Sequence, residues 1–179
     1  MRLRNFIALS FCTFGALSAQ QEKRKKMSAS NTLQLPFDLK ADQLAAVEIF
    51  HAFYSGKTGA GKQEVTLRGD GSVHLMKTRA YNLPEETLDG KLQRMNFIRL
   101  LEVAEEVNFP GLAEDYKPLS GDPYWRRVIR LTLPGGRVHT VAVQNDAPQR
   151  EFERLAGAIR VVASMAVPEM LNHRFFPNL

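Results

Sequence analysis

Two pairs of short segments with alternating apolar and polar residues, each pair joined by a tight-turn signal, constrain the fold most. Gln63–Leu67 and Ser72–Thr78 flank Asp70-Gly71, and Tyr124–Leu133 and Val138–Val143 flank a Pro-Gly-Gly turn. Aspartate and glycine tolerate the positive φ angles that tight hairpin turns require. Alternation with a period of two is typical of strands with one buried face. The sequence therefore predicts two antiparallel hairpins.

One further strand and two helices complete the expected fold. Ala46–Tyr54 is rich in β-branched and aromatic residues and predicts a strand. Lys91–Val107 carries an apolar stripe at helical spacing, and a second helix is expected from Pro148 to about Ala166. Asp38–Ala45 predicts a short helical turn, and residues 79–90 predict a loop. The order βββαββα indicates an α+β fold, in which two helices pack on one face of an antiparallel sheet of about five strands.

This layout resembles that of a family of small exported bacterial α+β domains of unknown function, over about residues 46–166. The shared features are structural: a glycine-rich loop after the first strand, an Asp-Gly hairpin, the close of a helix, and a helix started by proline. In this chain the glycine-rich loop is Ser55–Lys62, and the other three features correspond to Asp70-Gly71-Ser72-Val73, to Phe109, Leu112 and Tyr116, and to Pro148–Phe152. Members of the family carry cysteines near the first loop, and this chain has none there. The resemblance implies an exported location and no known activity.

Residues 1–19 have the pattern of an export signal. Arg2 and Arg4 give a positive start, Phe6–Leu17 is apolar and uncharged, and Ser18 and Ala19 are small enough for a signal peptidase. The apolar run is shorter than the roughly 20 residues of a membrane-spanning helix. We therefore expect cleavage near Ser18 or Ala19, export to the periplasm or the medium, and no stable transmembrane anchor.

The positive charge of the chain is concentrated before the expected domain. Residues 20–31 are polar and basic and predict a flexible linker, which leaves 32–179 as a single domain with a C-terminal tail. The chain has 24 basic and 19 acidic residues. Six of the basic residues and one of the acidic residues lie in residues 1–31, so the domain keeps 18 basic and 18 acidic residues. A neutral domain argues against general nucleic-acid binding, which depends on neutralising phosphates. The single cysteine, Cys12, lies in the signal, so the mature chain is expected to contain no cysteine.

The segment Gly56–Lys62 fits the G-x-x-x-x-G-K pattern of phosphate-binding loops. The next residue, Gln63, lacks the hydroxyl that holds Mg²⁺. The residues after it are expected to form a strand, whereas a phosphate-binding loop opens a helix whose N-terminus faces the phosphate. We therefore interpret the segment as a glycine-rich loop and expect no nucleotide.

The tripeptide Arg68-Gly69-Asp70 matches an adhesion motif of extracellular proteins and falls at an expected hairpin tip. Asp70-Gly71 is already explained by the chemistry of the turn. A turn is the favoured interpretation, and receptor adhesion is the alternative.

Three histidines, His51, His74 and His139, fall on expected strands and are considered as zinc ligands. His139 lies an even number of residues from the inward-facing valines of its strand, so we expect it to point inward. His74 alternates with the inward-facing residues of its own strand, so we expect it to point outward. Ligands on opposite faces of a sheet do not share one ion. We expect no metal site.

No serine lies beside a base in a recognisable catalytic pattern. Glu114, Asp115 and Asp122 fall in an irregular segment, where paired carboxylates are able to act as acid and base on a glycan. A solvated acidic loop is the favoured interpretation, because surface acids are common. We predict no catalytic residue and no cofactor, and an envelope hydrolase stays the enzymatic alternative.

Basic residues on two expected hairpins provide a candidate binding surface. Arg126 and Arg130 alternate with the apolar residues of their strand, so they are expected to point away from the core. Together with Arg68 and Thr66 they predict a cationic sheet face suited to an acidic partner or a sugar. The alternative is an ordinary open face with solvated charges.

The C-terminal tail carries two further candidate contact residues, Phe175 and Phe176. The tail is expected to dock on the domain, because termini with large apolar residues tend to be covered. If exposed, the two rings would bind a partner.

Taken together, these features predict an exported, non-enzymatic binding domain of the cell envelope, with an envelope protein or an acidic polymer as its partner. Besides the hydrolase, an inhibitor of an exported enzyme is the remaining alternative, and it requires the loop Gly56–Lys62 to project rigidly.

Overall fold

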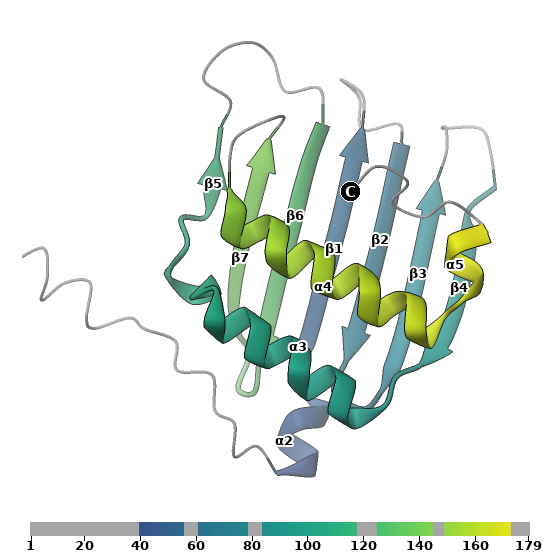
Figure 1. Ribbon diagram of the computed structural model, residues 1–179, viewed down its shortest axis with the longest axis horizontal. Helices are drawn as coiled ribbons and strands as arrows, with labels where there is room; N and C mark the ends of the chain where they lie inside the picture. The colour runs from purple at the N-terminus through teal and green to yellow at the C-terminus, as the bar shows by residue number, and fades with distance from the viewer. Residues whose placement is uncertain (1–39, 56–60, 79–83, 118–124, 145–148, 173–179) are drawn as a thin grey trace, which may run out of the picture. The chain divides into compact units, whose positions relative to one another are not determined.

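A seven-stranded mixed sheet with two long helices on one face makes up the described part of the chain (Figure 1). The computed structural model describes residues 40–55, 61–78, 84–117, 125–144 and 149–172, all within the unit Leu35–Leu179. The strands are β1 (Glu48–Ser55), β2 (Gly61–Arg68), β3 (Ser72–Thr78), β4 (Glu86–Lys91), β5 (Asp115–Tyr116), β6 (Trp125–Leu133) and β7 (Arg137–Gln144). The helices are α2 (Ala41–Ala45), α3 (Arg94–Glu106), α4 (Arg150–Ala166) and α5 (Glu169–Asn172), with the 3₁₀ turn η1 at Phe109–Gly111. The strand order is β4-β3-β2-β1-β6-β7-β5.

Strand β1 occupies the centre of the sheet, because it pairs antiparallel with β2 on one side and with β6 on the other. The registers align Ile49 with Leu67 and with Leu131, and all three side chains are buried. Side chains alternate between the two faces along a strand. The apolar positions of the three strands therefore share one face, and the positions between them share the other.

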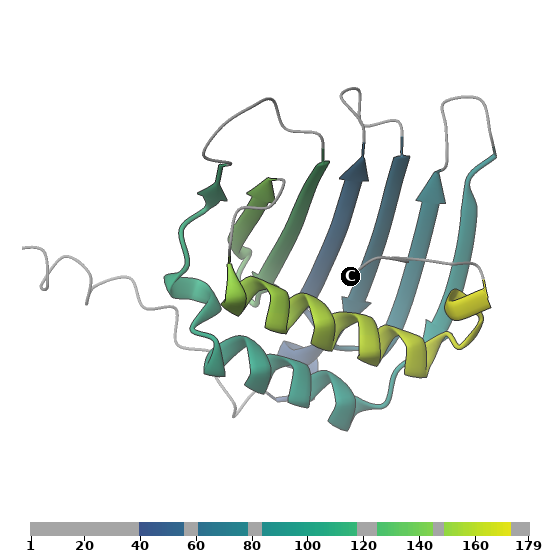
Figure 2. The same ribbon diagram turned by 45° about the horizontal axis from the view of Figure 1, so that its top comes forward.

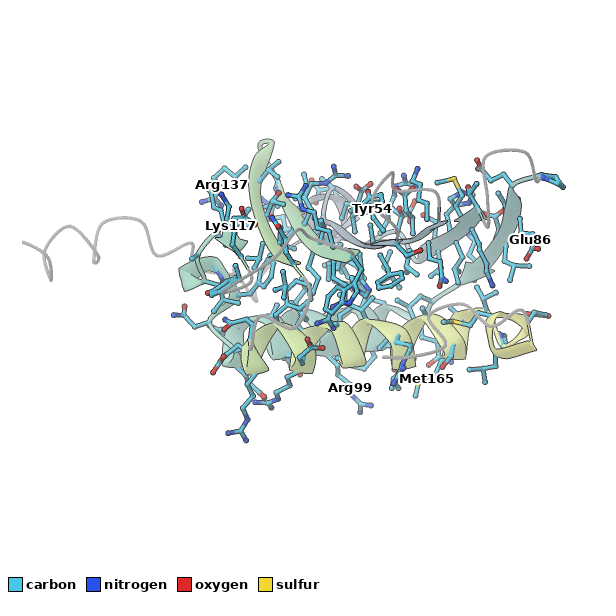
Figure 3. All side chains as sticks on the ribbon, turned by 90° about the horizontal axis from the view of Figure 1, so that it is seen from above. Tyr54, Glu86, Arg99, Lys117, Arg137 and Met165 are labelled. Atoms are coloured by element: carbon cyan, nitrogen blue, oxygen red, sulfur yellow. The ribbon has the colours of Figure 1, made fainter. Side chains whose placement is uncertain are left out.

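Helices α3 and α4 both cover the apolar face of the sheet (Figures 1 and 2). Viewed from above, the sheet and the helices form two layers, with Tyr54 and Arg99 on opposite sides of the assembly (Figure 3). Three fully buried phenylalanines lie in the core, one each in α3, η1 and α4: Phe97, Phe109 and Phe152. Burial of one such ring contributes roughly 1.5–3 kcal/mol, so these residues anchor the helical layer on the sheet.

The α+β class and both hairpins are confirmed. The turn between β2 and β3 places Gly71 at φ 86°, and the turn between β6 and β7 places Gly135 and Gly136 at φ 82° and 77°. The first long helix ends at Glu106, and Asn108 follows in the left-handed region with φ 48°. Pro110 then lies in η1, so the helix stops where the sequence predicts.

The prediction of about five strands, all antiparallel, is wrong. Residues 79–90 are expected to form a loop, yet Glu86–Lys91 is strand β4, which pairs with β3 over six aligned positions. Asp89-Gly90 has the sequence of a turn, but Gly90 serves close packing instead. A Cβ at Gly90 would lie 2.4 Å from the carbonyl oxygen of Ala166 at the end of α4. The glycine in this strand thus marks the close approach of a helix.

Strand β5 makes the sheet mixed, because it pairs parallel with β7. Only Asp115 and Tyr116 take part, aligned with Ala142 and Val143. Two residues are too few for an alternating pattern, so sequence periodicity has no means of detecting this strand. The short helix α5 likewise lies beyond the last predicted helix.

Gly69 in the β2–β3 turn packs closely against α2. Its N–H donates to the Val47 carbonyl at 3.0 Å, and a Cβ would lie 1.8 Å from the carbonyl oxygen of Leu44. Gly69→Ala is therefore expected to displace α2 and to lower the free energy of unfolding by roughly 1–3 kcal/mol. A Cβ at Gly157 in α4 meets nothing within 4 Å, so Gly157→Ala is expected to add about 0.5–1 kcal/mol. Urea unfolding compares the variants, and equal midpoints would contradict this account.

Candidate functional site

The side of the sheet that turns away from α3 and α4 carries the three arginines singled out in the sequence. We call the outward side of β2, β1 and β6 the open face, because none of the described helices lies on it (Figure 3). Its residues are Lys62, Glu64, Thr66 and Arg68 of β2, Glu48, Phe50, Ala52 and Tyr54 of β1, and Arg126, Val128, Arg130 and Thr132 of β6. The strand registers thus bring Arg68, Arg126 and Arg130 onto one surface.

Glu48 connects two of these arginines across the central strand. Arg68 donates from Nε to Glu48 Oε2 at 3.1 Å, and Arg130 donates from Nη2 to Glu48 Oε1 at 3.4 Å. The Arg130 guanidinium also lies 4.6 Å from the centre of the Phe50 ring. An arginine stacked on an aromatic ring and bonded to a carboxylate keeps a defined orientation. The cluster therefore presents two guanidinium groups from fixed positions.

A second cluster lies at the other end of the open face. The Tyr54 hydroxyl donates to Glu64 Oε1 at 3.2 Å, and Lys62 Nζ lies 3.0 Å from the same oxygen. Burial raises the pKa of the Tyr54 phenol, and the negative charge and hydrogen bond of Glu64 raise it further, while Arg126 and Arg130 act in the opposite direction. Tyr54 is therefore a neutral hydrogen-bonding group rather than a base at physiological pH.

Arg126 is exposed on the open face and forms no ion pair within the described residues. Its aligned neighbours are Tyr54 on β1 and Gln144 on β7, neither of which carries a charge at neutral pH. Across β2, β1 and β6, four cations face two carboxylates: Lys62, Arg68, Arg126 and Arg130 against Glu48 and Glu64. The open face is therefore locally positive although the sequence from residue 32 onward is neutral.

No protein-family model matches the chain, and a search of curated proteins finds no significant match. The resemblance to a family of small exported bacterial α+β domains, over about residues 46–166, therefore stays a prediction.

The histidines lie on both sides of the sheet. His51 is buried on the helix-covered side, in line with Val65 and Ile129, and the register places His139 on that side as well. His74 lies on the opposite side, where Nδ1 is 2.7 Å from the Asp89 carboxylate. In the ranges that the structure describes, no group of three metal-binding side chains comes together.

Sequence reasoning missed Arg127, a buried cation on the helix-covered side of β6. Its two terminal amino groups donate to the carboxylate oxygens of Glu153 on α4. The guanidinium also lies 4.8 Å from the Trp125 ring and 5.4 Å from the Phe152 ring. The alternation along β6 did indicate this position, because Arg127 lies on the same face as the apolar residues of the strand and Arg126 lies on the opposite face. Its partner is 26 residues away, and the β6 sequence alone does not identify it.

Neither the phosphate-loop pattern nor the adhesion tripeptide has the structural setting that its sequence suggests. Lys62, the last residue of the phosphate-loop pattern, lies in β2 and pairs with Glu64, whereas residues 56–60 lie outside the described residues. In the adhesion tripeptide, Arg68 pairs with Glu48, and the Asp70 carboxylate accepts hydrogen bonds from the Ser72 N–H at 2.7 Å and from its hydroxyl at 2.6 Å. These hydrogen bonds lower the pKa of Asp70. Both ends of the tripeptide therefore take part in the turn and the sheet.

The acidic segment forms the short strand β5 and its surroundings. Asp115 accepts a hydrogen bond from Gln144 at 3.0 Å and lies 3.8 Å from Lys117 Nζ, so its carboxylate contacts a neutral amide and a cation. Glu114 is exposed, and its main-chain carbonyl accepts from Ala142. Asp122 of the hydrolase alternative, and the tail residues Phe175 and Phe176, lie outside the described residues.

Proposed function

We propose that this protein is an exported, non-enzymatic binding domain of the cell envelope, and that its open face binds anionic groups of an envelope protein or polymer. The observation that carries the proposal is the arrangement of Arg68, Arg126 and Arg130 on one helix-free surface, with two of them oriented by Glu48. A surface of this kind attracts an acidic partner from a distance and orients it on contact.

The arginines keep hydrogen-bonding capacity for a ligand. Arg68 donates to Glu48 through Nε and Arg130 through one terminal amino group. Because a guanidinium has five N–H donors, each side chain retains donors for an incoming carboxylate or phosphate. The contacts with Glu48 reduce the rotamer entropy that is lost when the ligand binds.

The exported location rests on the pattern of residues 1–19, and the non-enzymatic character rests on the lack of a nucleophile beside a base in the sequence. Among the described residues, no helix has the length and apolar composition needed to span a membrane.

Charge reversal on the open face tests the proposal. The double variant Arg126→Glu/Arg130→Glu is expected to lower the affinity for poly-L-glutamate at least tenfold, because two attractive contacts become repulsive. Binding of the unmodified chain is expected to weaken with added salt, as surface electrostatics do. Fluorescence anisotropy with a labelled polymer measures both effects. Capture from an envelope extract with the two proteins then distinguishes an acidic protein from a polymer as the natural partner.

The matched control reverses charge on the other side of the molecule. Arg99 and Arg154 are exposed on α3 and α4, and Arg99 points away from the sheet (Figure 3). Arg99→Glu/Arg154→Glu changes the net charge by the same amount and is expected to retain most of the binding. Equal losses in both double variants would show a general charge effect and would overturn the assignment to the open face.

A further inference from the structure

The sheet ends at β4, and no other described strand pairs with the outer edge of β4. This strand pairs with β3 over six aligned positions, and it lies at the end of the sheet opposite β5 (Figure 1). The end of α4 packs on the face of β4 rather than along its edge, since a Cβ at Gly90 would meet the carbonyl oxygen of Ala166. The strand contains no proline, and its pairing with β3 has no bulge. It therefore lacks two of the devices that protect sheet edges from pairing with another chain.

One hydrogen bond shows which main-chain groups of β4 point toward the outer edge. The Leu92 N–H donates to the Gly71 carbonyl at 2.7 Å, and this pair extends the β3–β4 register by one position. In an antiparallel pair, the main-chain groups of successive residues point to alternate edges of the strand. Because those of Leu92 point toward β3, the N–H and C=O groups of the odd-numbered residues point outward: Thr87, Asp89 and Lys91.

We propose that the β4 edges of two copies of this chain pair antiparallel about a twofold axis perpendicular to the sheet, with Leu88 at the centre. Such an axis reverses the strand direction and keeps every side chain on its own side of the sheet, so the residues that face each other must share a side. With Asp89 at the centre, two aspartates would face each other. With Thr87 at the centre, Glu85 would face Asp89, and a centre at either end of β4 would pair few of its residues. The register centred on Leu88 avoids both clashes of like charge.

The register centred on Leu88 is complementary in charge and in hydrogen bonding. Glu85 faces Lys91 of the second copy, and Thr87 faces Asp89, each twice by symmetry. All four side chains are exposed, and that of Asp89 is 77% exposed although it contacts His74. The outward main-chain groups of Thr87 and Asp89 meet each other in this register, so each such pair exchanges two hydrogen bonds.

Pairing at β4 also continues the apolar layer from one copy to the next. Leu88 is half-buried on the helix-covered side and is aligned with the buried Leu75 of β3. In the dimer, the two Leu88 side chains face each other across the axis. Both open faces then lie on the same side of the joined sheet. If the open face binds anions as proposed above, a long acidic polymer contacts two such faces at once and binds more tightly than to one copy.

Sedimentation velocity of the full chain without any ligand tests the pairing independently of anion binding. The mass is expected to rise with concentration from 20.2 kDa toward twice that value. Contact along one short strand is smaller than the roughly 1,200 Å² of a stable interface, so we expect dissociation in the micromolar range or weaker. A mass that stays at the monomer value up to millimolar concentration would overturn the proposal.

Two sets of variants locate the association at β4. Thr87→Pro removes an outward N–H and leaves the bonds to β3 intact, so it is expected to weaken association roughly tenfold or more with an unchanged circular dichroism spectrum. The matched control Thr87→Val keeps the N–H and is expected to stay within about threefold of the unmodified chain. Lys91→Glu is expected to weaken association roughly tenfold, and Glu85→Lys/Lys91→Glu to recover it, because the swap restores opposite charges. Association that Thr87→Pro leaves unchanged, or that the charge swap fails to recover, would contradict the proposed pairing.

Disulfide cross-linking tests the central position. Facing residues at a pair without mutual hydrogen bonds have Cα atoms roughly 4.5 Å apart, within the range of a disulfide. Cys12→Ser/Leu88→Cys is therefore expected to give a covalent dimer under mild oxidation on a non-reducing gel. The matched control is Cys12→Ser/Val138→Cys, because Val138 is 52% exposed on β7, near the other end of the sheet. Equal cross-linking of the two proteins, or none at Leu88, would overturn the proposed register.

Discussion

Acidification from pH 7 to pH 4 is expected to lower the free energy of unfolding by about 3 kcal/mol through His51 alone. His51 is 1% exposed in the central strand, and burial lowers its pKa from 6.5 to about 3, with further repulsion from Arg127 and Arg160. The unfolded chain binds a proton below pH 6.5, whereas the folded chain does so only near pH 3. This contribution to stability is therefore complete above pH 6.5 and is lost as the pH falls toward 3.

Urea unfolding between pH 7 and pH 4 measures the effect as a difference between proteins. His51→Gln keeps a polar side chain that does not titrate, so its stability is expected to fall less than that of the unmodified chain over this range. The matched control is His74→Gln on the opposite side of the sheet, which removes a histidine whose side chain is 44% exposed and leaves His51 in place. Parallel stability curves for the unmodified chain and His51→Gln would show that His51 is not the source.

Removing the carboxylate of the Arg127–Glu153 pair is expected to cost more than removing its cation. The Arg127 side chain is 8% exposed and that of Glu153 is 46% exposed. Glu153→Gln leaves a buried guanidinium without its counter-ion, which costs 3–5 kcal/mol in fully buried pairs and about 2–3 kcal/mol here, because water reaches one partner. Arg127→Met leaves a carboxylate that water solvates and an aliphatic chain that packs on Trp125 and Phe152, so its cost is expected to be below about 1.5 kcal/mol.

Thermal and urea unfolding of the two single variants and the double variant check this asymmetry. The double variant Arg127→Met/Glu153→Gln is expected to be more stable than Glu153→Gln alone, because it no longer buries an unpaired charge. A larger loss in Arg127→Met than in Glu153→Gln would contradict the argument. The solvent-exposed pair Arg154–Glu106 is the control, and breaking it is expected to change stability by less than about 1 kcal/mol.

The sequence was sufficient to predict those strands and helices whose apolar residues recur at the spacing of a strand or a helix. The β2–β3 hairpin was predictable because Val65, Leu67, Val73 and Leu75 alternate on either side of Asp70-Gly71, and all four are buried. The same alternation in β6 indicated that Arg126 and Arg130 face away from the core. In contrast, β4 and β5 were missed, because one contains a turn-like Asp89-Gly90 and the other has two residues. Their strand character comes from pairing partners rather than from their own sequence.

The sequence by itself determined the α+β class, the two hairpins, the long helices and the outward parity of Arg126 and Arg130, because these depend on periodicity and turn chemistry within short segments. The tertiary structure decided that β1 lies between β2 and β6, that Glu48 joins Arg68 to Arg130, and that Arg127 is buried against Glu153. The physical reason is that pairing between distant strands, and the packing of a helix on a sheet, depend on which surfaces fit together across the whole domain.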